Sequence, residues 1–154
     1  AFQGMFRGAT KVTVDDKGRV VVPTRHRTLL AARGEGRLVV TADRDKCLLI
    51  YPTPDWEQIE QQVMSLPSLH PRSYELQHML VGRASEVELD GHGRIALSPE
   101  LREFVQLDRS AMLIGQGKRL ELWDEARWNE HCAEWAKTPL SGTDLPAQFG
   151  ALSL

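Results

Sequence analysis

The chain repeats itself, and this internal duplication constrains its possible fold more than any other feature of the sequence. Residues 9–27 (ATKVTVDDKGRVVVPTRHR) align with residues 84–102 (ASEVELDGHGRIALSPELR). The identical pairs are Ala9/Ala84, Val12/Val87, Asp15/Asp90, Gly18/Gly93, Arg19/Arg94 and Arg27/Arg102. A second block, residues 48–56 (LLIYPTPDW), aligns in the same order with residues 120–128 (LELWDEARW). Two blocks repeated in one order indicate a single structural unit that is used twice.

Both copies predict the same order of local structure. Polar and apolar residues alternate over 11–14 and 86–89, as they do in half-buried strands. The segments 15–18 and 90–93 predict turns, because an Asp side chain accepts hydrogen bonds from turn amides and glycine readily adopts positive φ. A returning strand, a proline-marked helix start, two further strands and an amphipathic helix follow in each copy. This order predicts a hairpin at each turn.

Each copy is only about half the length of a comfortable domain, so we expect the two to share one core. The predicted fold class is α+β: a pseudo-symmetric β-barrel built from two tandem β-repeats, each followed by an amphipathic helix. The expected division is repeat 1 at 9–54, linking helices at 55–82, repeat 2 at 84–126, a C-terminal helix at 127–138 and a mobile tail at 139–154.

Basic residues are concentrated in the first third of the chain. Residues 7–46 hold ten Lys and Arg against five Asp and Glu, although the whole chain has a formal net charge of −2. This asymmetry indicates an anionic partner for that part of the chain. A solvated basic face without a partner is the alternative that charge counting leaves open.

The turn motif D-x-x-G-R is the most distinctive local feature. Its members are Asp15, Gly18 and Arg19 in the first copy and Asp90, Gly93 and Arg94 in the second. An arginine fork suits phosphates and guanine edges, whereas a salt bridge that merely stabilises the turn is equally compatible with the residues. Further basic candidates for nucleic-acid contact are Arg7, Lys17, Arg25, Arg27 and Arg102. The second copy has His92 for Lys17 and Glu100 for Arg25, so we expect the first repeat to contact nucleic acid and the second to act as a scaffold.

The residues carry no pattern typical of a catalytic or metal centre, and we predict neither an enzyme nor a cofactor nor a small-molecule substrate. The five histidines are scattered, and neither H-E-x-x-H nor C-x-x-C occurs. The two cysteines, Cys47 and Cys132, are far apart, which is typical of a reducing cytoplasm. No apolar run approaches the ~20 residues that span a bilayer, and no secretory signal pattern opens the chain.

Five segments resemble the MraZ family. They are MFRGA (5–9), VDDKGRVVVPTRHR (14–27), LLIYP (48–52), HMLVGRASEVELDGHGRIALSPELR (78–102) and LELWDEARW (120–128). MraZ proteins are bacterial DNA-binding proteins with two SpoVT–AbrB-type repeats, and the resemblance covers residues 5–154. Residues 1–4 precede the family's usual start at Met5, so we expect them to be a cloning remnant.

The resemblance implies a nucleoid-associated transcriptional regulator that assembles into a ring-shaped homo-oligomer. Such a regulator binds double-stranded DNA at short G-rich direct repeats upstream of the division and cell-wall gene cluster, including its own promoter. The family motif falls on Asp15 and Arg19, and again on Asp90 and Arg94, so Arg19 is the expected leading DNA contact and Asp15 its orienting partner. The alternative is a ring-forming protein-interaction scaffold, or an antitoxin-like module with only nonspecific DNA affinity, whose exposed tryptophans bind another protein.

Overall fold

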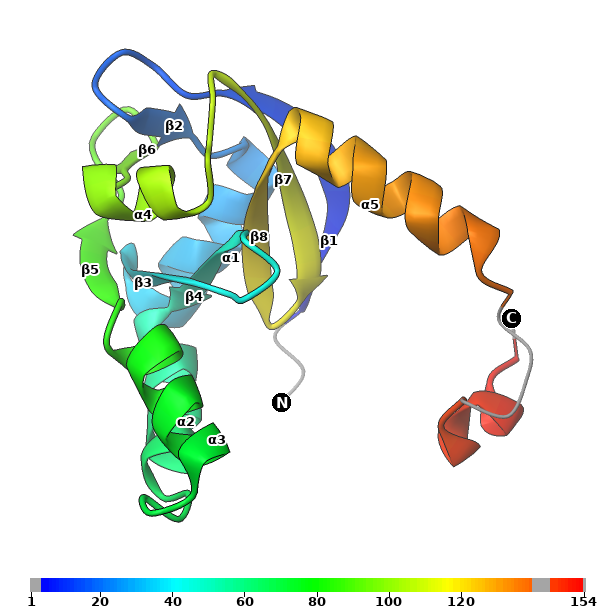
Figure 1. The fold of residues 1–154 in the computed structure, drawn as a ribbon. Helices are drawn as coiled ribbons and strands as arrows, with labels where there is room; N and C mark the ends of the chain where they lie inside the picture. Colours follow the sequence, from blue (N-terminus) through cyan, green and yellow to red (C-terminus); the bar gives the residue numbers. More distant parts are fainter. Residues whose placement is uncertain (1–3, 140–144, 154) are drawn as a thin grey trace.

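The computed structural model describes residues 4–139 and 145–153 and contains two antiparallel sheets (Figure 1). The larger sheet has six strands in the order β1 (Phe6–Thr13), β7 (Ser110–Gly117), β8 (Arg119–Asp124), β4 (Leu48–Pro52), β3 (Arg37–Ala42) and β5 (Ser85–Glu88). The smaller sheet pairs β2 (Arg19–Val21) with β6 (Arg94–Ala96), and we call it the ribbon.

The two repeats are interleaved rather than placed side by side. Strand β1 of the first repeat pairs along its whole length with β7 of the second, and β5 of the second pairs with β3 of the first. The ribbon also joins the two repeats. Within the described residues, the strands flanking the first turn are linked by one isolated bridge, Val14↔Val20, and by the backbone hydrogen bond from Asp15 N–H to the Arg19 carbonyl at 2.9 Å. The expected hairpin is therefore confined to the turn itself in each repeat, because the strands on either side of each turn form their ladders with the other repeat.

The large sheet does not close on itself. Strands β1 and β5 lie at its two edges, so the pairings form an open sheet. The mixed α+β class predicted from the sequence is confirmed, whereas the closed barrel is not.

Apolar side chains occupy both faces of the large sheet. All five residues of β4 are buried, and they alternate between two clusters: Leu48 and Ile50 face one, Leu49 and Tyr51 the other. Continuous burial on both faces explains why β4 reads as an uninterrupted apolar run. The first cluster also takes in residues of the ribbon and of two helices, α1 (Thr24–Gly34) and α4 (Pro99–Phe104).

The opposite face is covered by helices from the linking and C-terminal segments. Helix α2 (Thr53–Met64) and the π-helical segment η1 (Gln77–Val81) pack on β3, and α5 (Glu125–Lys137) packs on β7 and β8. Helix α3 (Pro71–Leu76) lies in the segment 55–82, where the sequence predicts linking helices, and begins with a proline. Helices α2 and α3 extend from the body as a pair, and α5 extends in another direction (Figure 1).

The expected terminal segments fall partly on residues outside the description. Of the predicted cloning remnant only Gly4 is described, and residues 140–144 and 154 of the predicted mobile tail lie outside the described part. Residues Ala147–Ala151 form a short 3-10 helix, η2, which the aperiodic sequence does not predict.

A buried histidine in α1 makes the fold sensitive to acid. His26 is only 3% exposed, its ring packs against Phe6, and within the described residues its Nε2 has no hydrogen-bond partner. Desolvation, together with the positive charge of Arg25, lowers the pKa of His26 below its ordinary value of 6.5. The folded chain therefore holds a neutral imidazole, while the unfolded chain takes up a proton as the pH falls through 6.5.

We accordingly expect the free energy of unfolding to fall as the pH drops below 6.5. In His26→Leu this part of the pH dependence should disappear, because leucine has no proton to gain in either state. Urea unfolding followed at a series of pH values and fixed protein concentration measures both slopes. Identical slopes in the two proteins would contradict the assignment.

Candidate nucleic-acid interface

The two D-x-x-G-R turns share one hydrogen-bonded geometry. In the first turn (residues 15–19), Asp15 Oδ1 accepts from the backbone N–H groups of Lys17 at 2.9 Å and Arg19 at 2.8 Å. Asp15 Oδ2 accepts from Arg19 Nε at 2.8 Å. In the second turn (residues 90–94), Asp90 accepts the two corresponding backbone bonds at 2.8 and 2.9 Å and the Nε–H of Arg94 at 2.9 Å. Each carboxylate therefore closes its turn and fixes the plane of an arginine.

Glycine is required where each turn reverses. Gly18 has φ +75° and Gly93 has φ +73°, a region that residues with a side chain rarely adopt. The hydrogen bond from the backbone N–H of Arg94 lowers the pKa of the Asp90 carboxyl to about 2. The corresponding bond from Arg19 lowers the pKa of the Asp15 carboxyl. Both carboxylates are therefore ionised near neutral pH, and the paired arginines keep their partners.

The ribbon presents both motif arginines on one outward face. Val20 and Ile95 are each 1% exposed and point into the core, so their neighbours along the strands point outward. Arg19 lies opposite Ala96, and Arg94 lies opposite Val21, which is 53% exposed. Ordinary antiparallel geometry separates such a diagonal pair by about 7–8 Å. Among the described residues no acceptor binds the terminal nitrogens of either guanidinium, so both forks remain available.

This pairing alters the roles expected of the two repeats. The sequence predicts a first repeat that contacts nucleic acid and a second that acts as a scaffold. The structure does not separate them in that way, because Arg19 and Arg94 share one surface built from both repeats.

A further cation at the first turn could not be identified from the sequence. Arg109, in the loop after α4, lies 3.3 Å from Asp16, and its carbonyl accepts the N–H of Val14 at 2.8 Å. No motif or charge run marks Arg109 in the sequence. Only the interleaving of the repeats brings it beside a turn that is distant along the chain.

The remaining predicted contacts are spread over a wider area. Arg25, in the first turn of α1, extends its side chain to β1, where its Nη2 donates to Thr10 Oγ1 at 2.7 Å. Arg7 pairs in register with Gln116 at the far end of β1, which places it roughly 25 Å along the strand from the first turn. The structure therefore does not bring Arg7 together with the turns. Arg27 and Arg102 are half-buried and each contacts the turn of the other repeat.

The two helices that follow the ribbon strands differ at their starts. In the first turn of α4 lies Glu100, and Ser98 Oγ accepts a backbone N–H at 3.2 Å. Helix α1 has no side-chain cap and no acidic residue in its first turn, where Arg25 and Arg27 lie instead. A helix N-terminus attracts anions, so the start of α1 is suited to a phosphate while that of α4 is already satisfied by the chain itself.

The buried cysteine of β4's preceding loop, Cys47, is a packed core residue. Burial, and then the nearby charge of Glu121, raise the pKa of the Cys47 thiol, so it is not ionised near neutral pH. Among the described residues no group of three or more His, Cys, Asp and Glu could hold a metal ion. In that same part of the chain no helix is long and apolar enough to cross a membrane.

Fold and site together define a class: a protein of interleaved β-repeats in which a charged turn occurs twice and faces outward. The family model described as "MraZ protein, putative antitoxin-like" matches residues 5–78 and 80–145. The chain belongs to the MraZ family.

Relatives in that family carry the name "Transcriptional regulator MraZ". One from Thioalkalivibrio sulfidiphilus is 48% identical over 150 residues, covering 97% of this chain and 100% of the relative. One from Coxiella burnetii is 47% identical over 152 residues, with the same coverage of both chains. One from Nitrosospira multiformis is 53% identical over 125 residues, covering 81% of this chain and 85% of the relative. These relatives are named as regulators of transcription, not as enzymes.

Proposed function

We propose that this chain binds double-stranded DNA in a sequence-specific manner through the outward face of the ribbon. The observation that carries the proposal is the pair of guanidinium groups, on Arg19 and Arg94, that Asp15 and Asp90 hold on one surface. A two-stranded antiparallel ribbon is small enough to enter the major groove, where arginine forks pair with the O6 and N7 atoms of guanine. Lys17 and the open start of α1 would bind flanking phosphates.

The proposed targets are short G-rich direct repeats upstream of the division and cell-wall gene cluster, including the chain's own promoter. The arginine chemistry of the ribbon supports a preference for guanine, and the proposed gene context rests on the resemblance to the MraZ family. The protein would then act in the cytoplasm in association with the nucleoid.

We propose further that the active form is a ring-shaped homo-oligomer. A single basic patch on an acidic chain would bind nonspecific DNA weakly, at about 10⁻⁴ M under physiological salt. Several copies on successive repeats gain roughly 10²–10⁴ in avidity without new contacts per subunit. Direct repeats also suit head-to-tail subunit contacts.

A protein-interaction role is the second candidate, and helix α5 favours it. No residue of α5 is buried, and Trp135 is 54% exposed although its ring lies 5.8 Å from that of Trp128. Trp56 and Trp123 are core residues, so only the outer part of the aromatic group is available to a partner.

A DNA titration separates the two candidates. The purified protein is titrated with a duplex carrying G-rich direct repeats and with a scrambled duplex, each at two salt concentrations. The regulator proposal expects tight binding to the repeats alone, strengthening with repeat number and weakening steeply with salt. Equal, weak binding to both duplexes would reject specific recognition and favour the protein-interaction role.

A further inference from the structure

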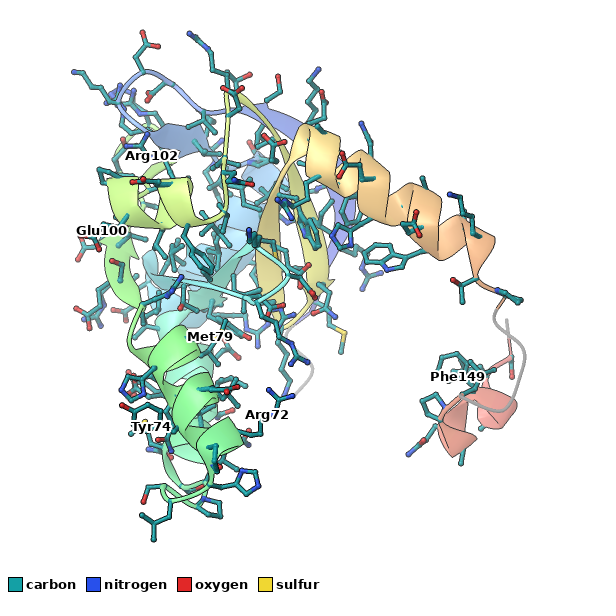
Figure 2. All side chains as sticks on the ribbon, in the orientation of Figure 1. Arg72, Tyr74, Met79, Glu100, Arg102 and Phe149 are labelled. Carbon is teal, nitrogen blue, oxygen red and sulfur yellow. The ribbon has the colours of Figure 1, made fainter. Side chains whose placement is uncertain are left out.

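The turn of each repeat is held by an arginine of the other repeat. At the first turn, Leu97 N–H donates to the carbonyl of Gly18 at 2.9 Å. The guanidinium of Arg102 lies directly over the same glycine, such that a β-carbon built on Gly18 would be 2.6 Å from Arg102 Cζ. Figure 2 shows Arg102 between α4 and β2. The glycine thus provides positive φ and also the space in which the arginine lies.

The second turn has the corresponding contacts, with the two repeats exchanged. Val22 N–H donates to the carbonyl of Gly93 at 2.9 Å, and a β-carbon on Gly93 would be 2.8 Å from Arg27 Cζ. Each arginine is anchored on its own repeat: Arg27 Nη2 donates to Thr24 Oγ1 at 2.7 Å, and Arg102 Nε donates to the carbonyl of Leu97 at 3.3 Å. The contacts therefore run crosswise between the repeats.

We propose that Arg27 and Arg102 are positioning residues that hold the D-x-x-G-R turns, each acting on the turn of the other repeat. This role accounts for two of the identical pairs in the internal alignment, Gly18/Gly93 and Arg27/Arg102, through one contact made twice. It also fits the burial of Arg27 Nε, which has no partner among the described residues and is not accessible to a phosphate.

The planar guanidinium is what the position requires. The guanidinium lies against a glycine of the other repeat while one of its N–H groups donates to an oxygen on its own repeat, whereas a lysine carries the same charge without this fixed planar geometry. Substitution by lysine therefore removes the positioning contact but preserves a cation for DNA. The expected loss of DNA affinity rests on the proposed function. The loosening of the turn does not, so it is measured separately on the DNA-free protein.

The first test is amide hydrogen exchange on the intact, DNA-free protein. In Arg102→Lys we expect faster exchange at Gly18 and Arg19, in the first turn, with little change in the second turn. In Arg27→Lys the pattern should be reversed, with faster exchange at Gly93 and Arg94. A role confined to each arginine's own helix would accelerate exchange in that helix and leave the opposite turn unchanged, which would overturn the proposal.

The second test is DNA affinity at fixed salt. Arg102→Lys should weaken binding to the G-rich repeats by about tenfold to a hundredfold, the range for losing one well-oriented arginine–base contact. Combined with Arg19→Ala it should cause no further loss, because it acts through Arg19. The matched control Arg44→Lys, at an exposed arginine away from the ribbon, should leave affinity unchanged. Full affinity in Arg102→Lys would identify a simple phosphate contact and overturn the proposal. If the unaltered protein does not recognise the repeats, the proposed function fails and hydrogen exchange alone decides the crosswise role.

Discussion

Arg19→Ala should abolish specific binding to the G-rich repeats while leaving the fold and the oligomer intact. One oriented arginine–guanine pair discriminates by about 1–3 kcal/mol, and the loss recurs in every subunit that binds a repeat. We therefore expect the apparent affinity to fall by roughly a hundredfold or more. The stability cost should stay below about 1 kcal/mol, because the Asp15–Arg19 ion pair is partly exposed and Asp15 keeps its two backbone hydrogen bonds. Titration with both duplexes and size-exclusion chromatography measure the two outcomes.

Two further substitutions show which part of the first turn recognises DNA. Arg94→Ala should cause a comparable loss, since Arg94 shares the outward face of the ribbon with Arg19. Asp15→Asn can retain the Oδ1 acceptor for the backbone amides but loses the anionic partner of Arg19 Nε. We expect it to weaken binding less than Arg19→Ala, because the guanidinium remains but is no longer fixed. Unaltered affinity for the repeats in Arg19→Ala at the same salt would reject the ribbon as the recognition surface.

Features of the chain that depend on neighbouring residues could be predicted from the sequence. The Asp–Gly–Arg turns form within five residues, so their hydrogen bonds and positive φ follow from local chemistry. The buried run of β4 and the helix start at Pro71 are local in the same sense. Five short segments of the sequence also indicated the MraZ family, and the family match confirms it.

Strand pairing could not be predicted in the same way. The segments around Val12 and Val87 are alike in pattern, and alternation fixes which face of a strand is buried but not which strand lies beside it. A pairing within each repeat and a pairing across the repeats bury similar residues, and only the complete core distinguishes them. The joint surface of Arg19 and Arg94, the position of Arg109, and the crosswise contacts of Arg27 all depend on that choice. Charge and spacing therefore identified Arg19, Arg94 and Arg27 as candidates but did not indicate what each one contacts.

The interleaving places unusual demands on the contact between β1 and β7. Strand β1 lies at the sheet edge and has β7 as its only ladder partner among the described residues. Gly115 of β7 lies opposite Gly8, and a β-carbon on Gly115 would collide with the backbone of β1 at Arg7 and would lie 2.5 Å from the carbonyl carbon of Phe6. Backbone atoms cannot rotate away as a flexible side chain can, so β1 would have to move. Such a movement would pull Phe6, a fully buried core residue, out of its packing.

We therefore expect Gly115→Ala to be strongly destabilising, at about 2–3 kcal/mol, within the range for forcing extra volume into a packed site. For a chain of this size, that corresponds to a decrease in Tm of roughly 5–10 °C. Gly91→Ala is the matched control, because its β-carbon meets no atom within 4 Å and its φ is not in the left-handed region. It should change stability by less than about 0.5 kcal/mol. Both are measured by thermal and urea unfolding at one protein concentration, since assembly would make Tm concentration-dependent. Equal stability of the two variants would mean that β1 approaches β7 less closely than the interleaved sheet requires. Selective loss in Gly115→Ala would identify the close β1–β7 contact as one of the pairings that stabilise the shared core of the two repeats.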